Sequence, residues 1–361
     1  MNNNEILMGR AIQLARKGKG KVSPNPLVGA VIVNRGTIVG TGYHKKAGEE
    51  HAEVAAIRKA GKKAKGSTMY VNLEPCCHYG KTPPCTEAIR KAGIKKVFIG
   101  TEDPNPLVSG KGIKQLTESG IKVMCSLLEK DARKLNEYYL TFMEKQRPFV
   151  ILKIAQTLDG KIADSTGNSK WITNENARRK VHSLRNEVDA ILTGIGTVIK
   201  DNPELTSRLP GNKKEPIRIV LDSHFKTPRN AKIARAGTII ATSLKSNSLK
   251  KNILIKKGVE IWQIPGKKDG ISLDKVLKKS RKEDIQSILV EAGAKVTSSF
   301  LREHLVDKLY IFISNKILGT GLPAIYNIGA NKLQKAILLE DSVFEKLNDN
   351  ILLTGYVHWN N

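Results

Sequence analysis

Three side chains in the first quarter of the chain are of the types that bind catalytic zinc. His51 opens the segment His51-Ala52-Glu53, and Cys76 and Cys85 flank a short stretch that ends in two prolines. One imidazole and two thiolates leave the fourth zinc position open for water, which is typical of catalytic zinc sites. We therefore expect His51, Cys76 and Cys85 to bind one Zn²⁺ per chain.

The neighbours of these residues leave one alternative open. His78 is a second imidazole that could replace His51 as a ligand, but its position two residues after Cys76 makes it the less favoured choice. Cys77 adjoins Cys76 and must point elsewhere, so we interpret it as a packing residue.

Glu53 supplies the second part of this chemistry. Hydrolytic deamination needs hydroxide at neutral pH, and zinc supplies it by lowering the pKa of bound water to about 7. The leaving amine must also be protonated, which requires a carboxylate beside the metal that does not bind it. A Glu two residues after the ligating His has this role in zinc deaminases that attack nitrogen heterocycles, so we predict that Glu53 is the catalytic proton shuttle.

Two helices must position these groups. Residues two apart on a helix point roughly 200° apart, so His51 and Glu53 cannot share one helical face. We therefore place His51 at or before the first turn of a helix over 51–60, with Glu53 inside it. Pro83 and Pro84 predict the start of a second helix over 85–92, because proline is favoured in a first turn.

The chain of 361 residues is too long for one compact core, and two domains are expected. The polar segment Glu144–Pro148 marks a boundary between a domain at 1–145 and another at 146–361. Four cysteines with metal-like spacing indicate a reducing compartment. The polar amino terminus does not resemble a signal peptide and no apolar run is long enough for a membrane span, so we expect a cytoplasmic protein that does not bind a membrane.

The net charge of +27 is compatible with nucleic acid or with phosphorylated small substrates. Lysine is spread along the chain, and aromatic residues make up only 5%, which is few for stacking on bases. We expect a generally basic surface that binds phosphate-bearing small molecules and no nucleic acid.

Apolar periodicity in the first half alternates between helices and strands, which predicts a three-layer α/β/α sandwich. Its predicted helices cover 3–18, 51–60, 85–92, 112–119 and one long segment from about 127 to 143. Its predicted strands cover 27–34, 37–41, 68–73, 95–100 and 121–124. The hairpin of the first two strands precedes the zinc helix, and the third strand delivers Cys76.

The second half is again α/β, with an antiparallel sheet edge expected at its end. Predicted strands cover 149–157, 287–290, 308–313 and 350–358. Alternating strands and loops are expected over 189–199, 217–222, 238–242 and 259–264, and helices over 174–187, 273–281 and 296–304. Two turns rich in small residues, Thr193–Thr197 and Glu291–Lys295, follow strands and could each present backbone amides to a phosphate.

The motifs taken together resemble the bifunctional riboflavin-biosynthesis deaminase/reductase family over nearly the full chain. In the first half the resemblance rests on Pro24–Gly29, Gly42–His44, His51–Glu53, Glu74–Cys85 and Asp103–Pro106. In the second half it rests on Leu158–Lys161, Ser169–Ile172, Leu184-Arg185, Thr193-Gly194, Asp201–Arg208, Leu221–Ser223 and Glu291–Gly293. Cys77 stands where the family more often has serine. The resemblance implies a cytidine-deaminase-like three-layer α/β/α domain followed by a dihydrofolate-reductase-like α/β domain.

The resemblance also implies two successive reactions. First, 2,5-diamino-6-ribosylamino-4(3H)-pyrimidinone 5′-phosphate loses its C2 amine, with zinc held by His51, Cys76 and Cys85 and with Glu53 as the shuttle. Second, NADPH reduces the ribosyl group to ribityl. The deaminase substrate would contact Asn25, His44, Lys81, Asp103 and Asn105. NADPH would contact Ala155, Trp171, Thr197, Asp201, Ser223 and Gly293, and the reductase substrate Ser169, Arg185, Leu205, Arg208 and Glu291.

Elementary chemistry supports part of this assignment. A sugar phosphate needs fixed cations, and Arg185 and Arg208 offer bidentate donors. Lys153, inward on the first strand of the second half, could protonate the opened sugar, although a lysine with its head in solvent is an equally good interpretation. The resemblance also allows a homo-oligomer.

Two other functions are compatible with the same motifs. A tRNA or nucleoside deaminase with an appended domain would account for the basic charge, but not for the reductase-like half. A nucleic-acid-binding protein with structural zinc would need a fourth protein ligand, and only three well-spaced ligands are found.

Overall fold

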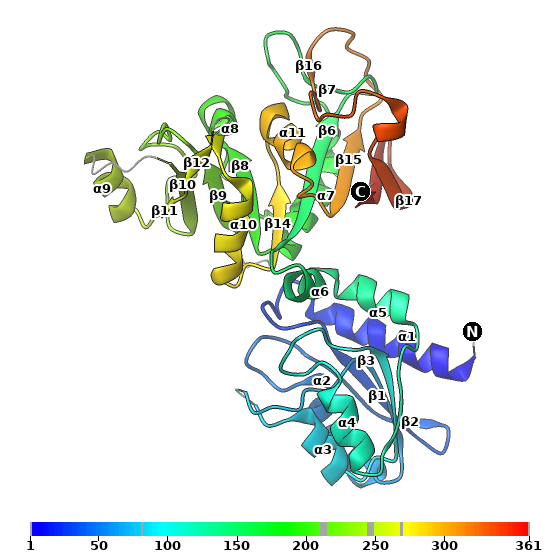
Figure 1. Cartoon of the computed structure of the whole chain (residues 1–361). Coiled ribbons are helices and arrows are strands. Elements are labelled where there is room, and N and C mark those ends of the chain that lie inside the picture. Colours follow the sequence, from blue (N-terminus) through cyan, green and yellow to red (C-terminus); the bar gives the residue numbers. More distant parts are fainter. Residues whose placement is uncertain (1, 81, 210–214, 244–248, 268–269, 360–361) are drawn as a thin grey trace. The chain divides into compact units, whose positions relative to one another are not determined.

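The computed structural model describes residues 2–80, 82–209, 215–243, 249–267 and 270–359. The chain divides into two compact units, Met1–Gln146 and Arg147–Asn361 (Figure 1). No helix among the described residues combines the length and the apolar character that crossing a membrane requires.

The first unit is built on a five-stranded sheet with the order β2-β1-β3-β4-β5. The β1–β2 hairpin and the β1–β3 pair are antiparallel, whereas β3, β4 and β5 run parallel. Its strands are β1 (Gly29–Asn34), β2 (Thr37–Tyr43), β3 (Thr68–Leu73), β4 (Lys96–Thr101) and β5 (Lys122–Met124).

Helices cover both faces of this sheet, as the predicted three-layer sandwich requires (Figure 1). Side chains alternate along each strand. Met69 and Val71 of β3 therefore pack with α2 (Ala52–Ala60), α3 (Cys85–Lys91) and α4 (Lys111–Glu118). Tyr70, between them, packs on the opposite face with α1 (Asn3–Ala15) and α5 (Glu129–Leu135). Short 3₁₀ turns follow α1 and α2 at Arg16–Gly18 and Gly61–Ala64.

The prediction of a single long helix over 127–143 is wrong. It is interrupted at Asn136, which separates α5 from α6 (Glu137–Glu144). Asn136 has φ −102° and ψ 20° and is only 3% exposed. Its side chain bonds to both backbone groups of Leu27. A partner so distant in sequence leaves no trace in the local apolar period.

The second unit contains a nine-stranded sheet with the order β11-β10-β9-β8-β14-β6-β15-β18-β17. Its pairs are parallel from β11 to β15, and β18 and β17 add the predicted antiparallel edge. The strands are β6 (Phe149–Gln156), β8 (Ala190–Gly194), β9 (Ile217–Leu221), β10 (Thr238–Thr242), β11 (Glu260–Gln263), β14 (Ser287–Val290), β15 (Lys308–Ile313), β17 (Leu338–Leu347) and β18 (Asn350–His358).

Smaller elements complete this unit. Two short ladders pair β7 (Lys161–Ala163) with β16 (Leu322–Pro323) and β12 (Gly266–Lys267) with β13 (Gly270–Ile271). Its helices are α7 (Glu175–Glu187), α8 (Ile195–Asp201), α9 (Leu249–Lys256), α10 (Leu273–Lys282) and α11 (Ala294–Arg302), and a 3₁₀ turn lies at Leu333–Lys335.

Several elements of the second unit differ from the prediction or were not foreseen, among them α9 and the short strands β7, β12, β13 and β16. α8 follows β8 where strands and loops were expected, because Gly196 and the β-branched Thr197 and Val198 have weak helix propensity. β17 was not predicted, because nearly all of its residues are exposed and its sequence has no clean apolar alternation.

Asp307 fastens the first strand of the second unit to its neighbour. Its carboxylate accepts hydrogen bonds from both terminal nitrogens of Arg147, at 2.6 and 2.8 Å. It also accepts from the backbone N–H of Val150 at 2.9 Å. Bidentate charge-assisted bonds of this kind are among the stronger polar contacts in proteins, so the start of β6 is held firmly beside β15.

Gly42 of β2 lets α2 pack closely against the sheet. A methyl group at this position would overlap the carbonyl oxygen of Ala52 and lie 2.7 Å from the backbone nitrogen of Ala56. We therefore expect Gly42→Ala to push α2 outward and to destabilise the first unit by about 1–3 kcal/mol. Hydrogen exchange of the amides of α2 would measure this loss separately from opening of the other unit.

Gly9 in α1 provides the matched control, because nothing lies within 4 Å of a methyl group added there. Gly9→Ala should stabilise the unit by about 0.5–1 kcal/mol, since alanine has the higher helix propensity. If the amides of α2 were equally protected from hydrogen exchange in wild type and in Gly42→Ala, the close approach of α2 to β2 would be contradicted.

Candidate deaminase and reductase sites

The predicted zinc ligands lie together in the first unit. His51 is the N-cap of α2, with φ −73° and ψ 160°, so it precedes the helix as expected. Cys76 lies in the loop after β3, and Cys85 is the first residue of α3. Nδ1 of His51 is 3.3 Å from Sγ of Cys85 and 3.5 Å from Sγ of Cys76.

These distances fit a tetrahedral zinc ion. Bond lengths of about 2.0–2.1 Å to nitrogen and about 2.3 Å to sulfur give nitrogen–sulfur edges of about 3.5 Å. All three candidate ligand atoms lie within 4.8 Å of one another, and His78 is not in this cluster. Cys77 directs its sulfur to the carbonyl of Leu107 and is not part of the cluster.

The donor set is also electrostatically suited to a cation. A hydrogen bond from the Cys85 thiol, assisted by His51, lowers the pKa of the Cys76 thiol to about 4. The same contact with Cys76, together with burial, raises the pKa of Cys85. A thiol that coordinates zinc is deprotonated, so both sulfurs can serve as thiolate ligands. Nε2 of His51 lies 3.3 Å from Oγ1 of Thr82.

Glu53 is buried beside this cluster. Its side chain is 3% exposed, and burial raises the pKa of its carboxyl to about 7. A group with a pKa near the working pH both takes up and releases a proton readily. Glu53 is therefore suited to carry a proton between two partners.

Asn25 and His44 form one wall near the cluster. Nδ2 of Asn25 is 3.0 Å from Nε2 of His44, and Nδ1 of His44 is 3.1 Å from the carbonyl of Glu50. Burial lowers the pKa of His44. A neutral ring with its proton on Nδ1 satisfies both contacts, because Asn25 then donates to Nε2 and His44 donates to Glu50.

Asp103 and Asn105 lie on the loop after β4. The carboxylate of Asp103 accepts from the backbone N–H of Asn105 at 2.9 Å. It also accepts from the hydroxyl of Tyr139, at 2.9 and 3.2 Å from its two oxygens. Burial raises the pKa of Asp103 to about 6. Lys81, the remaining predicted contact, lies outside the described residues.

Sequence reasoning missed the residues that hold these loops. Glu74 was noted only as part of a motif, yet its buried carboxylate accepts from the backbone N–H groups of Asp103, Gly110 and Ile113. Tyr139 was assigned only to a helix. The position of Glu74, an acidic residue directly after an apolar strand, could have indicated that its carboxylate is buried and bonded. Nothing local in the sequence indicates the partner of Tyr139.

The second unit contains a cavity of about 1440 Å³ at the carboxyl ends of its parallel strands. All of the predicted reductase residues line it. They are Lys153, Ala155, Ser169, Trp171, Arg185, Thr197, Asp201, Leu205, Arg208, Ser223, Glu291 and Gly293. The carboxyl edge of a parallel sheet is where α/β folds bind ligands.

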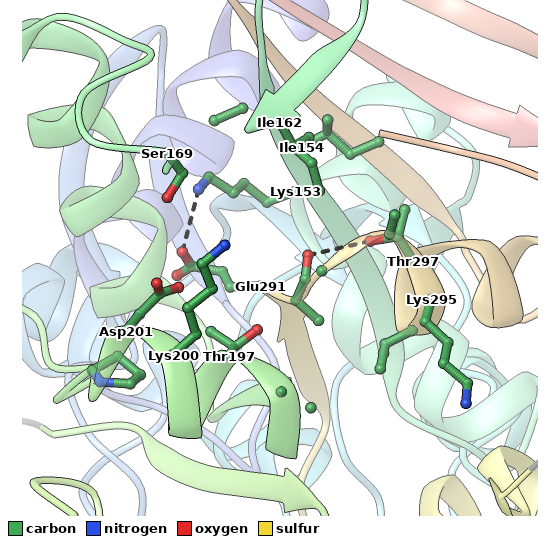
Figure 2. Close-up of a pocket in the computed structure, with 18 of the residues that line it drawn as sticks. Lys153, Ile154, Ile162, Ser169, Thr197, Lys200, Asp201, Glu291, Lys295 and Thr297 are labelled. Carbon is green, nitrogen blue, oxygen red and sulfur yellow. Dashed lines mark hydrogen bonds and ion pairs between the residues drawn. The ribbon is translucent and has the colours of Figure 1, made fainter. Parts of the chain in front are cut away.

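Glu291 is the electrostatic centre of this cavity (Figure 2). Its carboxylate accepts two bonds from Arg185, at 2.6 and 3.0 Å, and lies 3.4 Å from Nζ of Lys153. Burial alone would raise the pKa of Glu291, but the two cations outweigh it and lower the pKa to about 2. The side chain of Lys153 is 17% exposed, so its ammonium group faces the carboxylate and not bulk water.

The cavity also fits a dinucleotide cofactor. Its volume exceeds the range of about 300–1,000 Å³ that is usual for small-molecule sites, so cofactor and substrate have room together. Lysines that line it are available for phosphate groups, among them Lys200, Lys226, Lys232 and Lys295. In Figure 2 Lys200 is drawn beside Asp201, within the group of labelled residues, and Lys295 points away from Glu291.

Comparison with known proteins agrees with both sites. The family model described as the cytidine and deoxycytidylate deaminase zinc-binding region matches residues 1–101, and the RibD C-terminal domain matches residues 148–353. Riboflavin biosynthesis protein RibD of Aquifex aeolicus is 45% identical over 349 residues, which cover 96% of this chain and 96% of that protein. The chain belongs to the RibD family.

Other RibD proteins are similar over the same extent. The Escherichia coli protein is 40% identical, with 92% of this chain and 94% of that protein covered. Among solved structures, the Thermotoga maritima deaminase/reductase has a TM-score of 0.86 at 40% identity, over 98% of this chain and 99% of that one. Acinetobacter baumannii RibD has a TM-score of 0.89 at 37% identity, with coverage of 98% and 99%.

Membership of the RibD family confirms the predicted fold class, which is a cytidine-deaminase-like α/β domain followed by a reductase domain. The chain is a bifunctional enzyme of riboflavin biosynthesis. It deaminates 2,5-diamino-6-ribosylamino-4(3H)-pyrimidinone 5′-phosphate and then reduces the ribosyl group, giving 5-amino-6-ribitylamino-uracil 5′-phosphate. Its cofactors are zinc and NADPH.

The buried pair of cations beside Glu291 makes the second unit sensitive to this carboxylate. Glu291→Gln leaves Arg185 and Lys153 without a counter-charge, and we expect it to destabilise the unit by about 3–5 kcal/mol near pH 7. All three tryptophans, Trp171, Trp262 and Trp359, belong to this unit. Urea unfolding followed by tryptophan fluorescence therefore measures its stability alone.

The stability that the Glu291 carboxylate contributes should depend on pH. The pKa of Glu291 is lowered from an ordinary value of 4.5, so its contribution is present above about pH 4.5 and is lost as the pH falls through the lowered pKa. The Gln variant should lack this part of the acid loss. Identical unfolding curves for both proteins at pH 7 would show that the carboxylate contributes nothing.

Proposed function

We propose that each activity resides in one part of the chain, the zinc-dependent deaminase in residues 1–145 and the NADPH-dependent reductase in residues 146–361. The division of the structure between Gln146 and Arg147 supports this assignment. The separate extents of the two family matches support it as well. The observation that carries the proposal is the convergence of His51, Cys76 and Cys85.

In the deaminase, His51, Cys76 and Cys85 hold the zinc ion. Zinc supplies hydroxide at neutral pH by lowering the pKa of a water molecule to about 7. Glu53 accepts the proton that this water loses and delivers it to the departing amine, so that ammonia leaves and a carbonyl remains. The near-neutral pKa of Glu53 suits both transfers.

The deaminase substrate is received by Asn25, His44, Lys81, Asp103 and Asn105. Asn25 and a neutral His44 offer an amide and an imidazole edge of fixed orientation. On the other loop, Asn105 orders the turn through its own side chain, which accepts from the backbone N–H of Leu107 at 3.1 Å. Such groups recognise the polar edges of a pyrimidine better than an apolar pocket could.

In the reductase, Arg185 and Arg208 have different roles. The guanidinium of Arg185 is committed to Glu291 and to the carbonyl of Thr206, so it orients the carboxylate and has few donors left. Arg208 is 62% exposed at its side chain, and its ion-pair partner within the described part of the chain is Glu204, four residues away. A surface pair of that kind is weak, so Arg208 can exchange it for the phosphate of the substrate.

The remaining cavity residues divide between cofactor and substrate. Ser169, Leu205 and Glu291 complete the substrate site. Ala155, Trp171, Thr197, Asp201, Ser223 and Gly293 line the path of NADPH. NADPH supplies the hydride when bound, and the protein aligns it with C1′ of the sugar. Lys153 faces the same space and donates a proton to the opened sugar.

The enzyme is proposed to be cytoplasmic, to bind no nucleic acid and to form a homo-oligomer. Aromatic residues make up only 5% of the chain, which argues against base stacking. Phe344 on the edge strand β17 is 70% exposed, and Val343 beside it is 54% exposed. Exposed apolar groups on a sheet edge favour contact with another chain.

Ammonia release tests the deaminase assignment directly. Purified protein with the diaminopyrimidine ribotide should release ammonia with or without NADPH. Glu53→Gln should slow release by about 100-fold or more, because general acid–base catalysis contributes at least that factor. Zinc content should stay near one per chain, since Glu53 is not a ligand, whereas Cys85→Ser should lose the metal.

The reductase step on the deaminated product provides the internal control for both variants and should be unchanged. Ammonia release at the wild-type rate by Glu53→Gln would refute the proton-shuttle role. Loss of zinc from that variant would instead make Glu53 a ligand.

Lys153→Met tests the proton donor of the reductase. We expect NADPH oxidation with the deaminated substrate to slow by about 100-fold or more, because a positioned acid contributes at least that factor. Lys161→Met, on the neighbouring strand β7 and not among the residues that line the cavity, is the matched control and should oxidise NADPH normally. Full turnover by Lys153→Met would dismiss the role.

A further inference from the structure

α6, the last helix of the first unit, contacts two loops that carry proposed substrate residues. Asn136 precedes α6 and Tyr139 lies in its first turn. Asn136 bonds to Leu27 and Tyr139 bonds to Asp103, so the side chains of this short segment reach both loops. Both are buried, at 3% and 5% exposure.

Asn136 holds the loop that bears Asn25. Its Oδ1 accepts from the backbone N–H of Leu27 at 2.8 Å, and its Nδ2 donates to the carbonyl of Leu27 at 3.0 Å. Nδ2 of Asn72 also donates to that carbonyl, at 2.8 Å. Both backbone groups of Leu27, two residues after Asn25, are therefore fixed by side chains.

Tyr139 holds the loop that bears Asp103 and Asn105. Its hydroxyl donates to both oxygens of the Asp103 carboxylate. One of these oxygens also accepts from the backbone N–H of Asn105. The hydroxyl of Tyr139 therefore helps to fix the orientation of the carboxylate, which in turn holds the turn at Asn105.

Asn136 also explains why the helix is interrupted where it is. A straight continuation of α5 would keep Asn136 in helical geometry, but the residue has φ −102° and ψ 20°. Helix interruption loses backbone hydrogen bonds and is unfavourable without compensation. The bonds to Leu27 supply that compensation.

We propose that Asn136 and Tyr139 are positioning residues of the deaminase, which fix the two loops that receive the pyrimidine ribotide. Neither residue contacts the reacting atoms. Both act through Leu27 and Asp103, so they set how well the substrate is bound rather than how fast the bound substrate reacts. This inference rests on the proposed roles of Asn25, Asp103 and Asn105.

Tyr139→Phe is the sharpest test, because it removes one hydroxyl and keeps the ring. Without this hydroxyl the Asp103 carboxylate is no longer held in one orientation, and it binds the substrate less well in the ground state and the transition state alike. The KM for ammonia release should therefore rise by about tenfold, while kcat stays within about twofold of wild type. Zinc content and the reductase rate of the same chain should not change. Asn136→Asp keeps the acceptor for Leu27 N–H, loses the donor to Leu27 C=O, and should also raise KM.

Tyr70→Phe is the matched control for a purely structural effect. Tyr70 is likewise buried, at 4% exposure, and its hydroxyl donates to Asn4 at 2.7 Å on another part of the unit. It should lower the melting temperature without raising KM. An unchanged KM in Tyr139→Phe, or an equal rise in Tyr70→Phe, would overturn the positioning role.

Asn105→Ala separates failure of this inference from failure of the proposed function. If Asn105→Ala raises KM and Tyr139→Phe does not, the loop binds substrate but Tyr139 does not position it. If neither variant raises KM, the loop is not part of the substrate site, and both proposals fail.

Discussion

The deaminase unit depends on one steric constraint, the close approach of α2 to β2. His51 can meet Cys76 and Cys85 only if the first turn of α2 lies near the sheet. Gly42 permits this, since any side chain there would overlap the backbone of α2. Glu74 also ties the loop after β3 to the loop after β4 and to the start of α4, through the backbone N–H groups of Asp103, Gly110 and Ile113. The ligand positions are thus set by backbone packing before any metal is considered.

The reductase unit follows a different principle, in which buried charge determines geometry. A carboxylate at the end of β14 would be costly to bury alone. Arg185 from α7 and Lys153 from β6 surround it, so three elements far apart in sequence must come together at one point. The intact cluster contributes little net stability, but removing one member is costly because it leaves a buried charge without a partner. The same arrangement leaves a charged wall in a large cavity, which suits phosphorylated ligands.

Features that depend on local pattern were predictable from the sequence. Strands β3, β14, β15 and β18 begin and end where apolar periodicity placed them. The zinc cluster was equally accessible, because its residue types and spacing carry the chemistry. The reductase residues came from resemblance, since their approach to one cavity depends on long-range packing. Asn136 and Tyr139 could not be foreseen, because each has its partner in a distant loop.

The place of β6 in its sheet has a consequence for synthesis on the ribosome. β6 is the first strand of the second unit to emerge, yet it pairs with β14 and β15, so that Phe149 meets Ser287 and Lys153 meets Tyr310. Asp307, which accepts from the backbone N–H of Val150 at the start of β6, is translated equally late. The nascent apolar strand must therefore wait until most of the unit has been translated, while the first unit is already complete. Pairing across so long a separation is slow, and an exposed strand of this kind is a natural substrate for chaperones.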